Sequence, residues 1–207
     1  MTRGRFITFE GTEGVGKSTQ LETARSALEA AGIGVLVTRE PGGTPMAEAI
    51  RELLLTPRQE SVNSMTELLL MFAARAQHLH ERIVPALEQG TWVLCDRFTD
   101  ATYAYQGGGR GVPQEQIAAL EQLVQGDLRP DHVILLDAPV EVGMARARSR
   151  SAPDRFEREQ AAFFQRIRDC YLERARLQPL SYHVVDAAQP LSDVSRQVSG
   201  LITGLLA

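Results

Sequence analysis

The sequence has few cysteines: only Cys95 and Cys170 occur among its 207 residues. Two thiols are too few for a disulfide framework, and Cys95 lies in a run that predicts a buried strand, where a free thiol behaves as a small hydrophobic side chain. No leader resembling a signal peptide precedes the first predicted strand, and the longest apolar run, Leu68–Ala74, is too short to cross a bilayer. We therefore expect a cytoplasmic protein with no membrane partner.

The chain also has no excess of positive charge, because its formal net charge is −4. This balance gives no reason to expect nucleic acid as a partner, so any binding of polyanions must be local. A third absence is the Asn-Lys-x-Asp segment with which guanine-specific switch proteins read their base. The only asparagine, Asn63, is followed by Ser64 and Met65, which disfavours a GTP switch.

Five short runs of strand-forming residues alternate with helical stretches. Runs that are apolar on both faces are typical of a parallel sheet covered by helices. We predict one α/β domain over residues 1–207, a P-loop three-layer α/β/α fold with a doubly wound five-stranded parallel sheet. The predicted strands are Phe6–Phe9, Val35–Thr38, Trp92–Cys95, Val133–Leu136 and Tyr182–Val185. The predicted helices are Lys17–Ala31, Pro45–Leu55, Met65–Gln89, Pro113–Gln125, Val140–Arg150, Arg158–Leu177 and Pro190–Leu206.

A phosphate-binding motif, G-x-x-x-x-G-K-S, spans Gly11–Ser18 directly after the first predicted strand. Its glycines let successive backbone N–H groups face phosphate oxygens, the following helix adds its positive end, and Lys17 adds a charge. The hydroxyl of Ser18 suits Mg²⁺, which prefers oxygen ligands. We expect ATP and Mg²⁺ as cofactors. The residues expected to hold the nucleotide are Gly11, Thr12, Glu13, Gly14, Val15, Gly16, Lys17, Ser18 and Thr19.

A kinase also needs a second anion site for its acceptor, and four arginines elsewhere in the chain are placed to build one. Guanidinium groups suit phosphate, and the candidates are Arg39, Arg51, Arg75 and Arg97. Asp96 and Arg97 follow the third strand, where adjacent side chains point different ways. Asp96 can face the metal and Lys17 while Arg97 faces the acceptor phosphate. The alternative is a structural ion pair at a strand end.

Arg75 lies four residues after Met71 and three after Phe72 in a predicted helix, so these side chains share one face. That face can hold a planar base. The alternative is that the apolar residues are core and that Arg75 extends along them to solvent.

Five arginines lie in residues 146–158, across a helix end and a loop that contains Pro153. The segment follows the fourth strand, so it predicts a basic lid that closes over the phosphates and excludes water. A solvated charged surface is the alternative.

Several of these motifs together resemble the bacterial thymidylate kinase family, over about Phe6–Leu191. The resemblance implies the reaction of ATP with dTMP to give ADP and dTDP, Mg²⁺, and a homodimer. The segments that carry it are Phe9–Gly11 and the phosphate loop, Thr38–Thr44, Phe72–Arg75, Asp96–Phe98, Ala104–Gly111 and Asp154–Arg155.

The resemblance also assigns roles on the acceptor side. It implies that Glu13 contacts the 3′-hydroxyl of the sugar and that Tyr105 disfavours a 2′-hydroxyl. Whether Met71 or Phe72 packs on the base stays open, because the family often has Phe at the position of Met71. The residues expected to bind substrate are Glu13, Glu40, Arg51, Met71, Phe72, Arg75, Arg97, Thr102, Tyr105 and Gln106, of which Arg51 and Arg97 hold the phosphate and Arg75, Thr102 and Gln106 address the thymine edge.

Members of this family place a catalytic arginine either in the phosphate loop or in the lid. The variable loop positions here are Glu13 and Val15, so the chain is similar to the lid type. Arg150 is the first choice for the catalytic arginine of the lid. Arg148 and Arg146 are the alternates, and both are expected to bind the nucleotide. With the metal on Ser18 and Asp96, the expected catalytic residues are Lys17, Asp96, Arg97 and Arg150. A kinase for another nucleotide or deoxynucleoside, or a P-loop ATPase switch, is the alternative function.

Overall fold

The computed structural model describes residues 3–148, 155–157 and 159–206. Its centre is a parallel sheet of five strands in the order β2-β3-β1-β4-β5. The runs of apolar residues form these strands as predicted, and each differs from its prediction by one or two end residues. The strands are β1 (Phe6–Glu10), β2 (Val35–Arg39), β3 (Trp92–Asp96), β4 (His132–Asp137) and β5 (Tyr182–Asp186).

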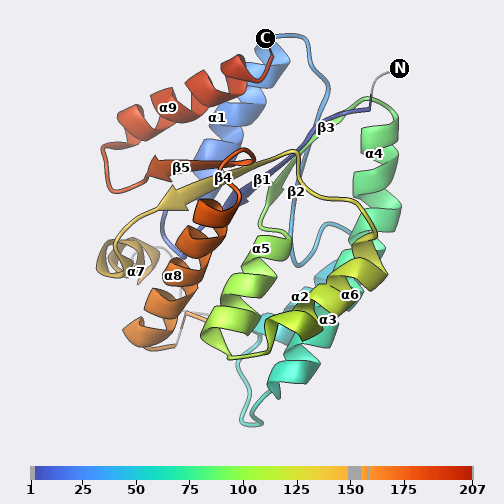
Figure 1. Ribbon diagram of the computed structural model, residues 1–207, viewed down its shortest axis with the longest axis vertical. Helices are drawn as coiled ribbons and strands as arrows, with labels where there is room; N and C mark the ends of the chain where they lie inside the picture. The colour runs from blue at the N-terminus through green and yellow to red at the C-terminus, as the bar shows by residue number, and fades with distance from the viewer. Residues whose placement is uncertain (1–2, 149–154, 158, 207) are drawn as a thin grey trace.

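Helices cover both faces of the sheet, which confirms the doubly wound three-layer architecture (Figure 1). On one face, α1 and α9 pack on apolar side chains of the central strands. On the other face lie α8 and the helical stretches that begin at Ser64 and Thr99. The helices are α1 (Lys17–Ala30), α2 (Pro45–Leu55), α3 (Ser64–His78), α4 (Val84–Glu88), α5 (Thr99–Thr102), α6 (Gln114–Gln125), α7 (Val140–Arg148), α8 (Ala161–Leu177) and α9 (Leu191–Gly204), with π-helical segments η1 (Leu79–Ile83) and η2 (Tyr103–Gly109).

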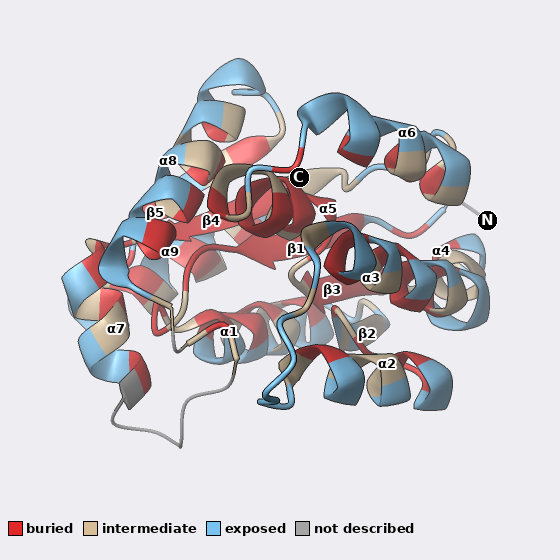
Figure 2. Ribbon diagram, turned by 90° about the horizontal axis from the view of Figure 1, so that it is seen from below, coloured by how far each residue is buried: buried red, intermediate tan, exposed pale blue. Residues whose placement is uncertain are grey.

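The core lies on both sides of the central strands, and the burial colours of Figure 2 show buried residues along the sheet and on the inner sides of the helices. Strand β1 is buried along its whole length. Because β1 occupies the middle of the sheet, the loop that follows it is held between β3 and β4. This position fixes the phosphate loop at the carboxyl edge of the sheet, where ligands bind in open parallel sheets.

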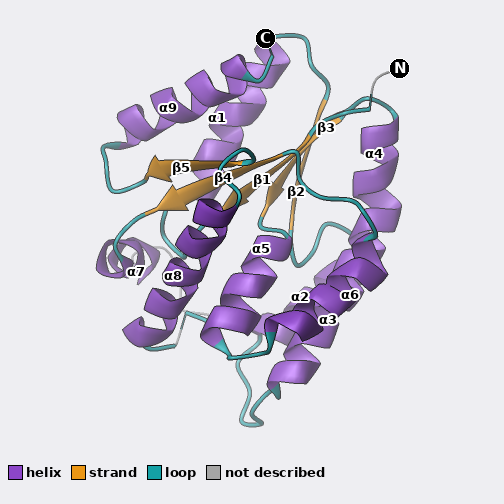
Figure 3. Cartoon of the chain, viewed as in Figure 1, coloured by secondary structure: helices purple, strands orange, loops and turns teal. Residues whose placement is uncertain are grey.

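The predicted helix Met65–Gln89 is helical from Ser64 to Glu88, and Figure 3 draws α3 and α4 in its helix colour. It is not α-helical throughout. It consists of α3, the π-helical segment η1 and α4. Pro85 lies in the first turn of α4. Proline has no backbone N–H to donate into the preceding turn, so the regular hydrogen-bond pattern changes just before it.

The glycine-rich segment Gln106–Gly111 is helical over most of its length. Residues 99–109 form α5 followed by η2. The glycines are there because the segment approaches α8 closely: a Cβ on Gly109 would lie 2.6 Å from the ring of Phe163, and one on Gly108 would lie 3.0 Å from a carbonyl oxygen of α8. Close helix contact, rather than chain reversal, explains this glycine run.

Residues 149–154 and 158, which make up most of the predicted lid, lie outside the residues that the structure describes. Helix α7 enters this segment, and residues 155–157 follow it. Within the described ranges, no helix is both long enough and apolar enough to span a membrane.

Candidate active site

A cavity of about 290 Å³ opens at the carboxyl edge of β1, β2 and β3. It brings together residues from seven parts of the chain. The predicted site residues that line it are Glu13, Gly14, Gly16, Lys17, Ser18, Glu40, Arg51, Met71, Arg75, Asp96, Arg97, Thr102, Tyr105 and Gln106.

The phosphate loop forms one side of this cavity. Gly14 and Gly16 have φ angles of +73° and +91°, which lie in the left-handed region that favours glycine. Lys17 is the first residue of α1, and its Nζ donates to the carbonyl oxygens of Gly11 at 3.2 Å and Thr12 at 2.8 Å. Burial and the nearby charge of Arg97 lower the pKa of Lys17 to about 8. An anion bound beside this amine would favour its protonated form and raise the pKa again.

Asp96 and Arg97 lie at the end of β3, beside the phosphate loop. Arg97 is the only described non-glycine residue with a positive φ, +67°. This turn carries its guanidinium across β1, where Nη1 donates to the carbonyl oxygen of Gly11 at 2.9 Å and Nη2 donates to Oε1 of Glu13 at 3.1 Å. Oδ1 of Asp96 is buried and has no hydrogen-bond partner within the described part of the chain. An acceptor of this kind fits a cation or a donor of a ligand.

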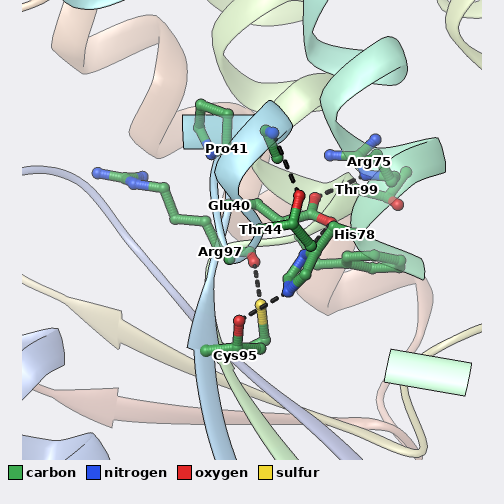
Figure 4. A network of polar contacts seen from close by, with 12 residues as sticks. Glu40, Pro41, Thr44, Arg75, His78, Cys95, Arg97 and Thr99 are labelled. Atoms are coloured by element: carbon green, nitrogen blue, oxygen red, sulfur yellow. Dashed lines mark hydrogen bonds and ion pairs between the residues drawn. The ribbon is translucent and has the colours of Figure 1, made fainter. Parts of the chain in front are cut away.

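Arg75 forms the opposite side of the cavity and is held by a buried network (Figure 4). Its Nε donates to Oε2 of Glu40 at 2.7 Å, and its Nη2 donates to Oγ1 of Thr102 at 2.9 Å. Glu40 in turn contacts Nδ1 of His78 at 3.1 Å, and Nε2 of His78 lies 2.6 Å from Oγ1 of Thr38. Each side chain of this network is therefore held in place by a hydrogen bond to the next one. Within this network, Nη1 of Arg75 is the one buried side-chain atom that has no hydrogen-bond partner among the residues described.

Between these two sides, Tyr105 and Glu13 face each other. The hydroxyl of Tyr105 donates to Oε1 of Glu13 at 2.6 Å. The guanidinium of Arg97 lies 4.7 Å from the centre of the Tyr105 ring. Burial raises the pKa of Tyr105, so its hydroxyl stays protonated and remains a donor. Oε2 of Glu13 is buried without a partner in the ranges that the structure covers, and it is free to accept from a ligand hydroxyl.

Met71 and Phe72 occupy different surroundings. Met71 lines the cavity, whereas Phe72 packs with Leu68 and Ile117 in the core and is 2% exposed. The guanidinium of Arg75 lies 4.8 Å from the centre of the Phe72 ring. Phe72 thus supports Arg75 from behind, and Met71 is the one of the two side chains that faces the cavity.

Proteins of known family are similar to this chain over nearly its whole length. The family model for thymidylate kinase matches residues 9–198. Thymidylate kinases from Pseudomonas savastanoi pv. phaseolicola and Pseudomonas syringae pv. syringae are each 60% identical to the chain over 203 residues, which cover 98% of this chain and 97% of each relative. The chain belongs to the thymidylate kinase family.

A solved structure of a relative gives the same result for the fold. The crystal structure of thymidylate kinase from Ehrlichia chaffeensis superposes with a TM-score of 0.77 at 34% identity, covering 97% of this chain and 99% of that chain. The resemblance and the fold inferred from the sequence are thus confirmed.

Some predicted site residues lie outside the cavity lining. Thr12 and Val15 are buried behind the phosphate loop, and Gly11 supplies a carbonyl oxygen to Lys17 and Arg97. Thr19 is exposed on α1. These positions shape the loop, but their side chains do not form the cavity wall.

The three candidate lid arginines differ in how far the structure describes them. Nη1 of Arg146 donates to the carbonyl oxygen of Ala187 at 2.8 Å. Arg148 is the last residue of α7, and its backbone alone is described. Arg150 lies outside the described residues.

The sequence did not single out two aromatic residues of the cavity wall. Phe98 lines it directly after Arg97, and the guanidinium of Arg75 lies 4.9 Å from the centre of its ring. Phe156, from the end of the predicted lid segment, lines it beside Tyr105. The position of Phe98 after a strand end was a usable signal, whereas nothing local marks Phe156. The further wall residues are Pro41, Leu55, Ala101 and Glu157.

Behind the site, Glu10 is a buried carboxylate that links three elements. It accepts from the backbone N–H of Phe98 at 2.7 Å and from the hydroxyl of Tyr171 at 2.9 Å. The same hydroxyl lies 3.3 Å from Nη1 of Arg97. Burial, followed by the charge of Asp100, raises the pKa of Glu10. Glu10 therefore anchors the turn that carries Asp96 and Arg97 without reaching the cavity itself.

Proposed function

We propose that the chain transfers the γ-phosphoryl group of ATP to dTMP, giving ADP and dTDP, with Mg²⁺ as cofactor. One observation carries the proposal: of the five buried side-chain atoms that lack a partner among the described residues, three belong to residues that line this one cavity. They are Oε2 of Glu13, Nη1 of Arg75 and Oδ1 of Asp96. Buried polar groups are nearly always satisfied, so these three atoms mark where ligand atoms bind.

The donor phosphates bind along the phosphate loop and Lys17. The backbone N–H groups of the loop and the start of α1 supply partial positive charge, and Lys17 supplies a full charge. Ser18 and Asp96 both line the cavity, and their oxygen atoms suit Mg²⁺. These two residues would hold the ion, which when bound neutralises phosphate charge.

The acceptor binds between Arg97 and Arg75. Arg97 and Arg51 bind its phosphate, and Nη1 of Arg51 already reaches the carbonyl oxygen of Pro41 at 2.8 Å at the cavity wall. Glu13 accepts from the 3′-hydroxyl of the sugar, and Tyr105 fills the space that a 2′-hydroxyl would need. At the far end, Nη1 of Arg75 donates to O4 of thymine, with Gln106 and Thr102 beside it.

The chemistry requires positioning and charge neutralisation more than proton transfer. The phosphate of dTMP is ionised near neutral pH, so its oxygen can attack the γ-phosphorus in line without a strong general base. Lys17 and Arg97 stabilise charge on the transferred group, together with an arginine of the lid. Arg150 is our first choice for that arginine, with Arg148 and Arg146 as alternates.

We further propose a homodimer and a cytoplasmic location. Large apolar side chains are exposed on α2 and α3, which pack against each other and could be covered by a second copy: Met46, Leu53, Met65 and Leu69 are 61%, 53%, 38% and 49% exposed. Both cysteines are free thiols, in keeping with a reducing compartment.

An acceptor panel tests the proposed reaction. ADP release from ATP and Mg²⁺ is measured with dTMP, dUMP, dCMP, dGMP, AMP, thymidine or no acceptor. We expect release that depends on dTMP. Faster release with another nucleotide would reassign the acceptor, and equal release with no acceptor would support an ATPase switch.

A further inference from the structure

Glu67, in the first turn of α3, is a buried carboxylate that binds three side chains from other parts of the chain. Its side chain is 0% exposed. Oε1 accepts from Nε2 of Gln106 at 2.8 Å and lies 3.4 Å from Nε of Arg110, and Oε2 accepts from Nη2 of Arg155 at 2.5 Å. Both oxygens of this side chain therefore serve as hydrogen-bond acceptors, one for the amide and one for a guanidinium group.

This contact determines which end of the Gln106 amide faces the cavity. An amide has a donor NH₂ and an acceptor carbonyl, and the NH₂ is the end that Glu67 binds. The reverse orientation would place the carbonyl oxygen against the carboxylate, where two acceptors repel each other. Gln106 is 1% exposed and lines the cavity. Its carbonyl oxygen is thus the end available to a ligand.

Arg75 and Gln106 thus present a donor, Nη1, and an acceptor, the amide carbonyl oxygen, to the same cavity. Thymine presents the complementary pair, with O4 as acceptor and N3–H as donor. Cytosine presents the opposite pair at the same edge, because its 4-amino group donates and its N3 accepts. A buried site that is built to hydrogen-bond one pattern strongly rejects the other, since its own polar groups are then left unpaired.

We propose that Glu67 is a positioning residue that fixes the Gln106 amide, so that the cavity accepts a 4-oxo pyrimidine and rejects a 4-amino pyrimidine. The inference rests on the proposed placement of the base between Arg75 and Gln106. Glu67 itself does not touch the substrate; it acts through Gln106.

The same carboxylate also holds the end of the predicted lid segment. Arg155 additionally donates from Nε to the carbonyl oxygen of Leu54 at 2.7 Å, and the next residue, Phe156, lines the cavity. A change at Glu67 can therefore alter the cavity wall as well as the amide. The test must separate a general loss of activity from a change in base selectivity.

The experiment compares Glu67→Gln with the wild-type enzyme through the ratio of kcat/KM for dTMP to kcat/KM for dCMP. A glutamine at position 67 offers both a donor and an acceptor, so the Gln106 amide can rotate by 180° and present its NH₂ group to the cavity. We expect the ratio to fall about tenfold, the effect of releasing one fixed hydrogen-bonding group. Disturbance of Arg155 alone would lower both values together and leave the ratio unchanged.

Glu121→Gln is the matched control. Glu121 is also a buried glutamate, on α6, but it accepts from the hydroxyl of Tyr103 at 2.6 Å and pairs with Arg129, neither of which lines the cavity. This variant keeps the selectivity ratio of the wild-type enzyme. If Glu67→Gln does not fold, Glu67→Asp replaces it: this change keeps the charge for the arginines but draws the carboxylate away from Gln106, and it also lowers the ratio.

Gln106→Ala separates the two parts of the inference. If this variant keeps the wild-type ratio, the proposed placement of the base is wrong. If Gln106→Ala lowers the ratio and Glu67→Gln does not, the role of Glu67 is overturned. The inference predicts that Glu67→Gln changes the ratio no further when Gln106 is already alanine, because the two residues act as one unit.

Discussion

The two sides of the cavity are built in different ways. The side proposed for the donor, the donor side, is one contiguous segment, Gly11–Thr19, that offers backbone N–H groups and one lysine. The side proposed for the acceptor is the acceptor side. The acceptor side is made of side chains: Glu40 follows β2, Arg75 lies on α3, and Gln106 lies on η2. The difference shows that backbone recognition can be encoded locally, whereas side-chain recognition needs the whole fold to bring distant residues together.

The two sides are also stabilised differently. Glycine conformations at Gly14 and Gly16 hold the donor side. On the acceptor side, buried charged groups are paired: Glu40 binds Arg75 and His78, and Glu67 binds Gln106 and two arginines. Such pairs fix orientation, because removal of one member leaves a buried charge without a partner.

The largest expected effect comes from Arg97, the residue at which the two sides meet. Its side chain contacts Gly11 and Glu13 of the phosphate loop and lies over the ring of Tyr105 on the acceptor side. Arg97→Ala should lower kcat about a thousandfold, as removal of a charge that stabilises the transition state does. The measurement is the steady-state rate with saturating ATP and dTMP, and circular dichroism checks the fold.

Arg25→Ala is the control for this variant. Arg25 lies on the exposed side of α1 and pairs with Glu22 and Glu29, so its loss should leave kcat unchanged. A folded Arg97→Ala enzyme with a rate near that of the wild type would show that the two sides do not meet at this residue.

A smaller effect is expected from alanine at the glycines of the donor side. A Cβ on Gly14 would lie 1.9 Å from the carbonyl oxygen of Gly143 on α7, whereas a Cβ on Gly16 would meet nothing within 4 Å. Gly14→Ala must displace the loop and should weaken binding of an ATP analogue about a hundredfold. Gly16→Ala incurs only the strain of a positive φ, about 1–2 kcal/mol, and should lower the affinity for the analogue about tenfold at most.

Calorimetric titration with the ATP analogue and, separately, with dTMP measures both variants. The affinity for dTMP should change much less than the affinity for the analogue. If Gly16→Ala is the more damaging of the two, the backbone account of the donor side is incorrect.

The smallest effect concerns the charge of Lys17. Because burial lowers its pKa to about 8 in the free enzyme, the lysine is protonated below that pH and loses its charge as the pH rises through it. A neutral lysine does not attract phosphate, so the affinity for the ATP analogue should fall about threefold by pH 8.5. Titrations from pH 7 to 9 measure the change. In Lys17→Met the same series should be flat, and a parallel fall in that variant would assign the pH dependence to another group.

The sequence was sufficient for the parts of the site that are local in the chain. The order of strands and helices, the phosphate loop and the strand-end pair Asp96 and Arg97 all follow from contiguous motifs. Arg75 was a candidate from its helix face, which it shares with Met71 and Phe72, whereas the role of Gln106 came only from the family resemblance. The structure brings both residues to the cavity wall.

What could not be predicted depends on contacts between distant residues. Glu67 looks like an ordinary acidic residue in the first turn of a helix, and its burial against Gln106 and Arg155 appears only after α3, η2 and residue 155 are brought together. Phe156 is hidden for the same reason. The close packing at Gly108 and Gly109 is hidden as well, because the sequence does not show that Phe163 and α8 pack against them.

The most direct test of the central claim, that one cavity has a backbone-built donor side and a side-chain-built acceptor side, is a paired titration of Arg75→Met. The buried network around Arg75 does not include the phosphate loop. The account predicts that calorimetry will find binding of dTMP weakened about a hundredfold or more, since a buried charged hydrogen bond is lost, with binding of the ATP analogue unchanged. Equal weakening of both ligands, or unaltered binding of dTMP, would contradict it.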